Sequence, residues 1–317
     1  MALVNVKFLL SVVVPVFNEQ EVLPETCRRL PAVLDQLGSE YELIFVDDGS
    51  RDDSFAVLLE LAKCDPRIKV IRLSRNFGQQ VAVSAGLDCA AGDAVIVMDA
   101  DLQDEPEAIP EFVRQWQQGY DVVYNVRDRR LRQPFVRRLG TNLFYDLLRR
   151  FAGIEIPEQV GLFRLVDRRV VEAVRAMHET NRFLPGMFAW AGFKQIGLHR
   201  DRPDRAAGRP KPLTKLAALA LDALISFSNF PLRVALWLGA IVSSASFLLG
   251  AYLVVRKIIE PARPLDGWRS LVVTSLFLGG VQLVALGIIG EYVGRLYDEA
   301  KRRPLYLVRE RVNFEGK

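Results

Sequence analysis

Two long apolar segments near the carboxyl end constrain this chain more than any other feature. Val234–Val255 and Ser270–Gly290 contain no charged side chain over 22 and 21 residues, respectively. A helix needs about 20 apolar residues to cross the hydrocarbon of a bilayer. The 14-residue connection, Arg256–Arg269, contains two prolines and one glycine, which predict a turn. We therefore expect a hairpin of two transmembrane helices. The alternative, two buried helices of a soluble core, is disfavoured because globular helices of this length rarely lack charges throughout.

Basic residues beside these segments predict how the hairpin is oriented. Seven Lys or Arg lie in residues 200–233, seven in the tail after the second segment, and four in the connection. The cytoplasmic flanks of membrane helices carry the excess of Lys and Arg. We therefore expect a multi-pass protein of the inner (plasma) membrane, with both ends of the hairpin and the large amino-terminal region on the cytoplasmic face.

Short apolar runs alternate with helical patterns over the amino-terminal region. The expected strands are Leu9–Val16, Tyr41–Val46, Lys69–Leu73, Ala94–Met98 and Asp121–Val126. The expected helices are about Glu21–Leu37, Asp52–Lys63, Gln79–Ala90 and Pro106–Gln117. The strands are short and rich in Val and Ile, as is typical of a parallel sheet buried on both faces. This pattern predicts an open, mostly parallel α/β sheet of the Rossmann-like type, with helices on both faces.

Four regions are expected along the chain. They are an α/β domain (1–211), a juxtamembrane amphipathic helix (212–231), the two membrane helices (232–292, with spans at about 234–255 and 270–290) and a basic cytoplasmic tail (293–317). The net charge of +4 is too small to indicate nucleic-acid binding. Two histidines, and three cysteines without a Cys-x-x-Cys motif, argue against a His- or Cys-based metal site and against a Ser-His-Asp triad.

The strongest chemical signal follows the fourth expected strand. Asp99 and Asp101 are two residues apart at a strand end, so both side chains project to the same side. With the amide of Gln103 they form an all-oxygen donor set for Mg²⁺ or Mn²⁺. A cation held there can neutralise a diphosphate leaving group. An isolated Asp-x-Asp is more often a solvated turn, but the position directly after a buried strand favours the metal site.

Polar residues also follow the first two strands. A carboxylate of Asp47 or Asp48 can accept hydrogen bonds from a ribose or from a base N–H. The alternative is an Asx turn that leads into the next helix. The segment Pro15–Glu19, which includes Asn18, either frames a nucleotide base or only turns the chain.

Arginines are concentrated in residues 127–150, which contain eight of them. Arginine binds phosphate oxygens bidentately, and it is also attracted to anionic lipid. We expect Arg127, nearest the sheet, to serve the site, and Arg149 and Arg150 to contact lipid. Arg164 and Arg205 are either additions to an acceptor site or surface charges.

Two basic amphipathic stretches are expected to connect the sheet domain with the membrane. They are Gln133–Phe151 and Leu213–Phe230. Helices of this type can lie in the headgroup layer; the alternative is an ordinary surface helix.

Several motifs together resemble family 2 glycosyltransferases, and in particular the polyprenyl-phosphate glycosyltransferases, which include dolichol-phosphate mannosyltransferases and bacterial undecaprenyl-phosphate (bactoprenol) glucosyltransferases. The motifs are SVVVPVFNE (11–19), VDDGS (46–50), RNFG (75–78), AGLD (85–88) and DADLQD (99–104). The resemblance continues through RFL (182–184), WAGF (190–193) and PLR (231–233) into the two apolar segments.

The resemblance implies a GT-A fold, a nucleotide-sugar donor and a divalent cation, Mg²⁺ or Mn²⁺. It assigns the metal and diphosphate to Asp99, Asp101 and Gln103, and the nucleotide to Asp47 and the segment with Pro15, Asn18 and Glu19. Asp48, Gly78 and Asp99 are also expected to bind the nucleotide sugar. The resemblance assigns the acceptor phosphate to Arg127, Arg137 and Thr141, and it matches Arg205 and Lys211 to the basic positions of the family's flexible loop. Arg164, Arg205 and Lys211 are expected to add to the acceptor-phosphate site. Asp101 and Arg127 are the expected catalytic residues, and a homo-oligomer is expected.

The acceptor half departs from the family pattern. Leu162 stands where Gly-Asp-Phe-Arg-Leu usually has its aspartate, and Pro185 where Arg-Phe-Leu-Arg-Gly has its second arginine. Pro210 and Pro212 flank Lys211 in a loop that usually carries a hydroxyl residue and a tyrosine.

The expected reaction is inverting transfer of a sugar from a nucleotide-diphosphate sugar, such as a UDP-hexose, to a polyprenyl phosphate such as undecaprenyl phosphate. One alternative is a processive synthase, which would need more membrane spans and a Gln-x-x-Arg-Trp motif. The other is a catalytically impaired paralogue that binds nucleotide sugar or serves as a partner subunit at the membrane.

Overall fold

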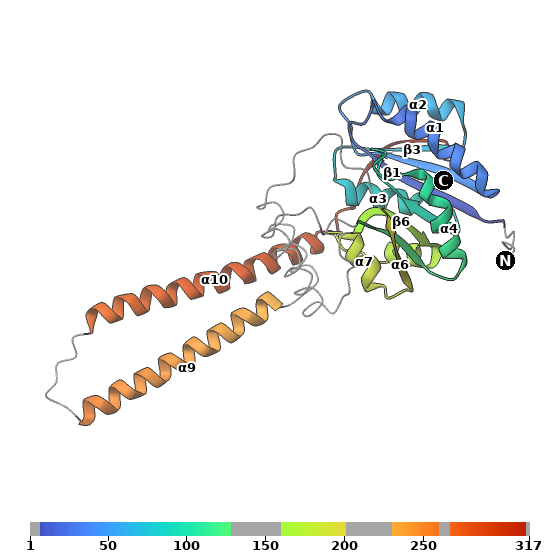
Figure 1. Ribbon diagram of the computed structural model, residues 1–317. Helices are drawn as coiled ribbons and strands as arrows, with labels where there is room; N and C mark the ends of the chain where they lie inside the picture. Colours follow the sequence, from blue (N-terminus) through green and yellow to red (C-terminus); the bar gives the residue numbers. More distant parts are fainter. Residues whose placement is uncertain (1–6, 128–159, 201–229, 260–266, 315–317) are drawn as a thin grey trace. The chain divides into compact units, whose positions relative to one another are not determined.

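The computed structural model describes residues 7–127, 160–200, 230–259 and 267–314. Two compact units divide the chain. The described part of the first unit contains one mixed sheet in the order β7-β5-β6-β4-β1-β2-β3-β8 (Figure 1). Its strands are β1 (Leu9–Val16), β2 (Glu40–Asp47), β3 (Ile68–Leu73), β4 (Ala94–Val97), β5 (Val122–Arg127), β6 (Val160–Asp167), β7 (Gln195–Arg200) and β8 (Val308–Val312).

The predicted parallel sheet is confirmed at its centre. Strands β4, β1, β2 and β3 are neighbours in this order, and all three pairs are parallel. These four strands and β5 begin and end within one residue of the predicted bounds. Two strands run in the opposite direction, because β6 lies antiparallel between β4 and β5, and β8 lies antiparallel on β3.

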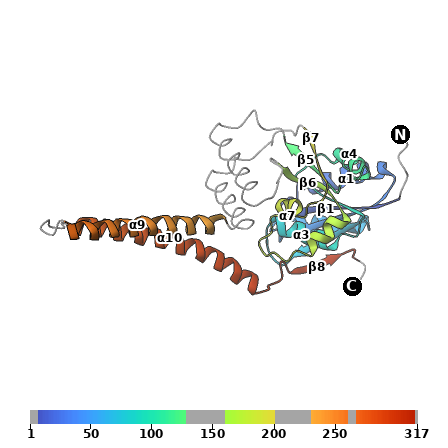
Figure 2. The same cartoon turned by 90° about the horizontal axis from the view of Figure 1, so that it is seen from below.

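Helices cover both faces of this sheet (Figure 2). They are α1 (Leu23–Leu34), η1 (Asp35–Leu37), α2 (Ser54–Cys64), α3 (Gln79–Cys89), η2 (Pro106–Ala108), α4 (Ile109–Gln117), α6 (Arg168–Arg175) and α7 (Leu184–Trp190). Val12 and Val14 of β1 pack in one core with α1, α2 and α4. Val13 points to the opposite face and packs in a second core with α3, α6 and α7. The central strands are therefore buried on both faces, as their Val and Ile content predicts.

The carboxyl-terminal tail contributes a strand that the sequence did not predict. Strand β8 pairs with β3, and the carbonyl of Leu307 accepts a hydrogen bond from the Ser74 amide at 2.8 Å. The Tyr306 hydroxyl donates to Asp88 of α3 at 2.8 Å. The three middle residues of β8 are charged and exposed, so the strand lacks the apolar alternation by which a strand is recognised.

The second unit contains α9 (Phe230–Ile259) and α10 (Trp268–Ala300), drawn in orange and red in Figure 1, and the two helices contact each other. Each contains a segment that is long and apolar enough to cross a membrane, and neither segment is buried in the protein. Phe247 is 77 % exposed and Leu276 is 72 % exposed. Such surfaces are unfavourable in water and suit lipid. The two helices contain the predicted spans and indicate that the chain associates with a membrane.

Candidate active site

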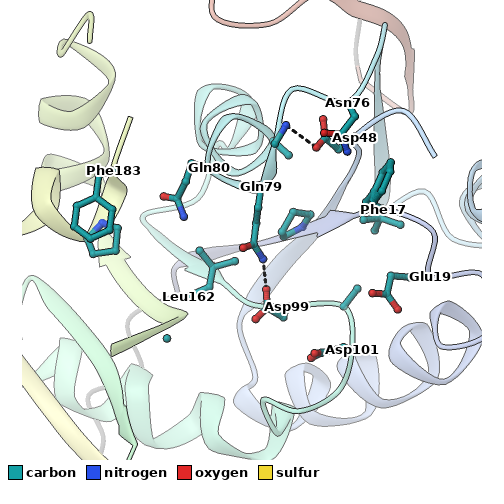
Figure 3. Close-up of a pocket in the computed structure, with 17 residues that line it drawn as sticks. Phe17, Glu19, Asp48, Asn76, Gln79, Gln80, Asp99, Asp101, Leu162 and Phe183 are labelled. Carbon is teal, nitrogen blue, oxygen red and sulfur yellow. Dashed lines mark hydrogen bonds between the residues drawn. The ribbon is translucent and has the colours of Figure 1, made fainter. Parts of the chain in front are cut away.

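A pocket of about 660 Å³ opens at the carboxyl ends of the parallel strands (Figure 3). Six of the predicted site residues line it: Pro15, Glu19, Asp48, Gly78, Asp99 and Asp101. The topology explains the position. The chain passes from β1 to β2 and β3 on one side, and then crosses to β4 on the other side of β1. Ligands of open α/β sheets bind outside the strand ends where the strand order reverses in this way.

The acidic wall of the pocket follows β4. Asp99 and Asp101 both line the pocket, as predicted. The Thr26 hydroxyl of α1 donates to the carbonyl of Ala100, the residue between the two aspartates, at 3.0 Å. The backbone amide of Gln103 donates to Oδ1 of Asp101 at 3.1 Å. The turn that carries the two carboxylates is therefore held from both the helix side and the loop side. The Gln103 side chain does not line the pocket.

Glu19, which follows β1, adds a third carboxylate to this side of the pocket (Figure 3). Burial raises the pKa of Glu19, and the nearby negative charges of Asp101 and Asp52 raise it further. Three carboxylates, those of Glu19, Asp99 and Asp101, therefore concentrate negative charge on this side of the pocket. Such a region is electrostatically suited to a cation.

The carboxylates of the pocket match only part of the ligand set that a divalent cation needs. Among the described residues, no group of three or more His, Cys, Asp or Glu side chains is arranged to enclose a metal ion. Mg²⁺, however, is usually bound by one or two carboxylates, with waters and substrate phosphates as the other ligands. Asp99 and Asp101, which share one pocket wall, fit that pattern, in which the ligand completes the metal site.

Asp48 holds a neighbouring loop. Its Oδ1 accepts from the Phe77 amide at 2.7 Å and its Oδ2 from the Gly78 amide at 2.9 Å. Burial raises the pKa of Asp48, against the opposing effect of these two hydrogen bonds. Gly49 has a φ of +70°, and a Cβ there would lie 2.6 Å from the backbone of Arg75. Both the carboxylate and the glycine are therefore needed to keep the loop after β3 in place.

Asp47 and Asn18 lie beside the pocket without lining it. Asp47 is fully buried, and its Oδ1 accepts from the Ser50 amide at 3.0 Å. The Asn18 amide donates to the Ser50 hydroxyl at 3.0 Å, and the Asn18 side chain accepts from the Arg51 amide at 2.8 Å. These bonds join the turns after β1 and β2. Both residues therefore form turns in this structure, which was the alternative to nucleotide binding. Their contact with a nucleotide stays a prediction.

The opposite wall is apolar. It is formed by Gly161 and Leu162 at the start of β6 and by Phe183 and Pro185 around the start of α7 (Figure 3). Two departures from the family pattern, Leu162 and Pro185, therefore lie in the pocket itself.

Arg164 lies behind this wall and does not line the pocket. It is 3 % exposed and donates to the carbonyls of Gly161 at 2.8 Å and Leu162 at 3.2 Å. Its guanidinium also lies over the Phe188 ring at 4.9 Å. Burial lowers its pKa to about 10. In this structure the Arg164 side chain supports the wall, since its Nε and Nη2 donate to the carbonyls of two wall residues and its guanidinium lies over the Phe188 ring.

Arg137, Thr141, Arg205 and Lys211 lie outside the described residues, as do most of the two amphipathic stretches. Arg127 is the last residue of β5, and the structure describes only its backbone.

Several pocket residues were not predicted as site residues. They include Asn76, Gln79, Gln80 and Phe183. Asn76 carried a signal, because it follows the third strand in a motif shared with the family. The two glutamines are uncharged residues at the start of a helix, and nothing in their local sequence marks them.

Comparison with known proteins agrees with this geometry. The family described as glycosyl transferase family 2 matches residues 11–175. The uncharacterized glycosyltransferase YkcC of Bacillus subtilis (strain 168) is 44 % identical over 97 % of this chain and 95 % of its own length. The bactoprenol glucosyl transferase of Shigella phage SfV is 41 % identical over 95 % of this chain and 98 % of its own.

Among solved structures, a glucosyl-3-phosphoglycerate synthase from Mycobacterium tuberculosis, in complex with Mn²⁺, UDP and phosphoglyceric acid, has 19 % identity and a TM-score of 0.47. That similarity covers 69 % of this chain and 76 % of the other.

The sheet, its helices and the pocket at the strand ends are of the GT-A type, and the family match makes this protein a glycosyltransferase. The chain belongs to glycosyl transferase family 2, since the family match covers more than half of it and close relatives align along nearly its whole length.

Proposed function

We propose that this enzyme transfers a hexose from a nucleotide-diphosphate sugar, a UDP-hexose, to a polyprenyl phosphate such as undecaprenyl phosphate. The observation that carries the proposal is the placement of Asp99 and Asp101 on one wall of a pocket at the switch point of the sheet, in a chain with two exposed apolar helices. The high identity to a protein named bactoprenol glucosyl transferase supports a polyprenyl acceptor and a glucosyl group.

The proposed reaction inverts the configuration at the anomeric carbon. An oxygen of the acceptor phosphate forms a bond to this carbon while the bond to the donor's β-phosphate oxygen breaks, and the electron pair leaves with the nucleoside diphosphate. The acceptor phosphate is already an anion at neutral pH, so the reaction needs no strong general base. Positioning and charge on the phosphates would supply most of the rate enhancement.

The roles of individual residues follow from their place around the pocket. Asp99 and Asp101, with Gln103 near them, would hold Mg²⁺ or Mn²⁺. When bound, the cation would neutralise charge on the departing diphosphate. The turn after β1, with Pro15 and Glu19, and the loop held by Asp48 would contact the nucleotide sugar. Arginines 127 and 137, with Thr141, Arg205 and Lys211, are proposed to bind the acceptor phosphate.

The hairpin is proposed to cross the inner membrane twice, with the α/β domain on the cytoplasmic face. The chain leaves the α/β unit before α9 and returns to it after α10, where β8 pairs with β3. Two crossings return the chain to the side that it left, as this pairing requires. Self-association and the proposed boundaries at residues 212, 232 and 293 remain predictions.

Leu162 supports a second candidate function. It lies in the pocket where the family pattern has an aspartate, so the chain could bind nucleotide sugar at the membrane as a catalytically impaired paralogue.

One experiment distinguishes sugar transfer to a polyprenyl phosphate from binding of nucleotide sugar without transfer. Membranes containing the protein are incubated with a panel of labelled nucleotide sugars and Mg²⁺ or Mn²⁺, and lipid is extracted. We expect a chloroform-soluble, mild-acid-labile product that Asp101→Asn nearly abolishes. Donor binding without lipid product would favour the impaired paralogue. Turnover of Asp101→Asn at the wild-type level with saturating metal would refute the metal assignment.

A further inference from the structure

Two consecutive glutamines at the start of α3 contact opposite walls of the pocket. Gln79 and Gln80 both line it (Figure 3). Gln79 reaches the acidic wall, and Gln80 reaches the apolar wall.

Gln79 binds a proposed metal ligand directly. Its Nε2 donates to Oδ1 of Asp99 at 2.6 Å. An ionised carboxylate has only acceptor oxygens, so the amide nitrogen must face Asp99. One carboxylate oxygen is thereby fixed in direction. Because an amide is neutral, it does so without cancelling the charge that would attract a cation.

Gln80 supports the apolar wall, also through a hydrogen bond of its side-chain amide. Its Oε1 accepts a hydrogen bond from the Leu184 amide at 3.1 Å. Leu184 is the first residue of α7, and its N-cap residue, Phe183, provides no side-chain cap. The amides of a helix's first turn have no partner within the helix. Gln80 therefore caps α7 from another element and fixes the segment that carries Phe183 and Pro185 into the pocket.

The first turn of α3 is itself held in place. The Gly78 amide donates to Asp48, and the Ser84 hydroxyl donates to the Gln80 carbonyl at 2.9 Å. Ala82, Val83 and Ala85 of the same helix are fully buried against the sheet. Because the backbone at the start of α3 is fixed, the side chains of Gln79 and Gln80 can hold their hydrogen-bond partners in position.

We propose that Gln79 and Gln80 are positioning residues for opposite halves of the reaction: Gln79 orients Asp99 for the metal and donor diphosphate, and Gln80 orients the Phe183–Pro185 wall for the acceptor. The division into donor and acceptor halves rests on the proposed function.

The test uses Gln79→Met and Gln80→Met in the full-length protein in detergent. Methionine keeps the length of the side chain and removes its hydrogen-bonding groups. Each variant is the matched control of the other, and Gln117→Ala, on the exposed end of α4, controls for substitution in general. Mn²⁺ binding in the presence of UDP is followed by electron paramagnetic resonance, and amide exchange is followed by mass spectrometry.

For Gln79→Met we expect Mn²⁺ affinity to fall about 10- to 100-fold, the usual effect of removing a residue that orients a metal ligand. The kcat at saturating metal should stay close to wild type. For Gln80→Met we expect unchanged Mn²⁺ affinity, faster exchange over residues 184–187 and a higher KM for the lipid acceptor. Loss of folding alone would instead lower kcat and the unfolding midpoint in both variants.

The proposal is overturned if Gln79→Met binds Mn²⁺ as wild type does, or if the two variants change metal binding and exchange alike. Failure of the proposed function is a separate result. If wild type made no lipid product while Gln79→Met still weakened Mn²⁺ binding and Gln80→Met still accelerated exchange at α7, the positioning roles would stand without the proposed acceptor.

Discussion

Asp48 offers a direct test of whether a carboxylate at a strand end binds ligand or holds the loop that lines the pocket. It is 3 % exposed, and its two oxygens accept from the amides of Phe77 and Gly78 at 2.7 and 2.9 Å. Asparagine offers one acceptor oxygen and one amino group. In either orientation the amino group of Asp48→Asn would face a backbone N–H, so at least one hydrogen bond is lost and two donors oppose each other.

The magnitude follows from these contacts. A hydrogen bond to a charged group contributes about 1.5–3 kcal/mol. Burial raises the pKa of Asp48, so the carboxylate carries a desolvation cost that asparagine lacks. Subtracting it leaves a net loss of about 1–2 kcal/mol. For a unit of this size that corresponds to a fall of about 2–8 °C in the unfolding midpoint.

The assay is thermal unfolding of the full-length protein in detergent without nucleotide, together with amide exchange at residues 76–80. Asp53→Asn is the control, because Asp53 is exposed beside the same turn and its side chain does not cap α2. We expect a lowered midpoint and faster exchange only in Asp48→Asn. An unchanged midpoint combined with weaker UDP binding would show that Asp48 acts on the nucleotide and does not hold the loop, and would refute the reasoning.

Three further predictions concern the unit that carries the site. Burial raises the pKa of Glu42, but its hydrogen bonds outweigh burial and leave this pKa below the usual 4.5. One of these hydrogen bonds comes from Lys69 at 2.6 Å. The stability that this carboxylate contributes is therefore present above pH 4.5 and is lost as the pH falls through the lowered pKa. Glu42→Gln should lower the unfolding midpoint at pH 7 and make the midpoint fall less steeply in acid. Parallel curves of midpoint against pH for the variant and the wild type would contradict this. Gly86→Ala should cost about 1–3 kcal/mol by overpacking against Val13, whereas Gly239→Ala, whose Cβ meets no neighbour within 4 Å, should not destabilise in chemical denaturation. Ending the chain after Arg303 removes β8, and we expect faster amide exchange along β3; unchanged exchange would show that β8 does not protect this edge.

The sequence was informative where structure depends on neighbouring residues. The central strands and the Asp99–Asp101 turn were predicted because apolar runs and the polar residues directly after them are local patterns. Strand β8 was missed because its middle residues are charged, and it becomes a strand only by pairing with β3. Arg164 was expected at a surface or an acceptor, since an arginine is rarely buried. Its burial depends on two backbone carbonyls and the Phe188 ring, of which the sequence gives no sign.

The distribution of charge across the pocket suits transfer to a phosphate better than transfer to water. Among the described lining residues, the carboxylates come from the turns after β1, β2 and β4, whereas the facing segments contribute Gly161, Leu162, Phe183 and Pro185. Water must lose a proton to attack a sugar carbon effectively, and a general base speeds such a step by about 10²–10⁴-fold. A phosphate monoester is already anionic and needs no such help. The described residues of the apolar wall contain no ionisable group that could act as a base for water. The proposed phosphate nucleophile does not need such a base, and leucine at position 162 is compatible with the proposed chemistry for that reason.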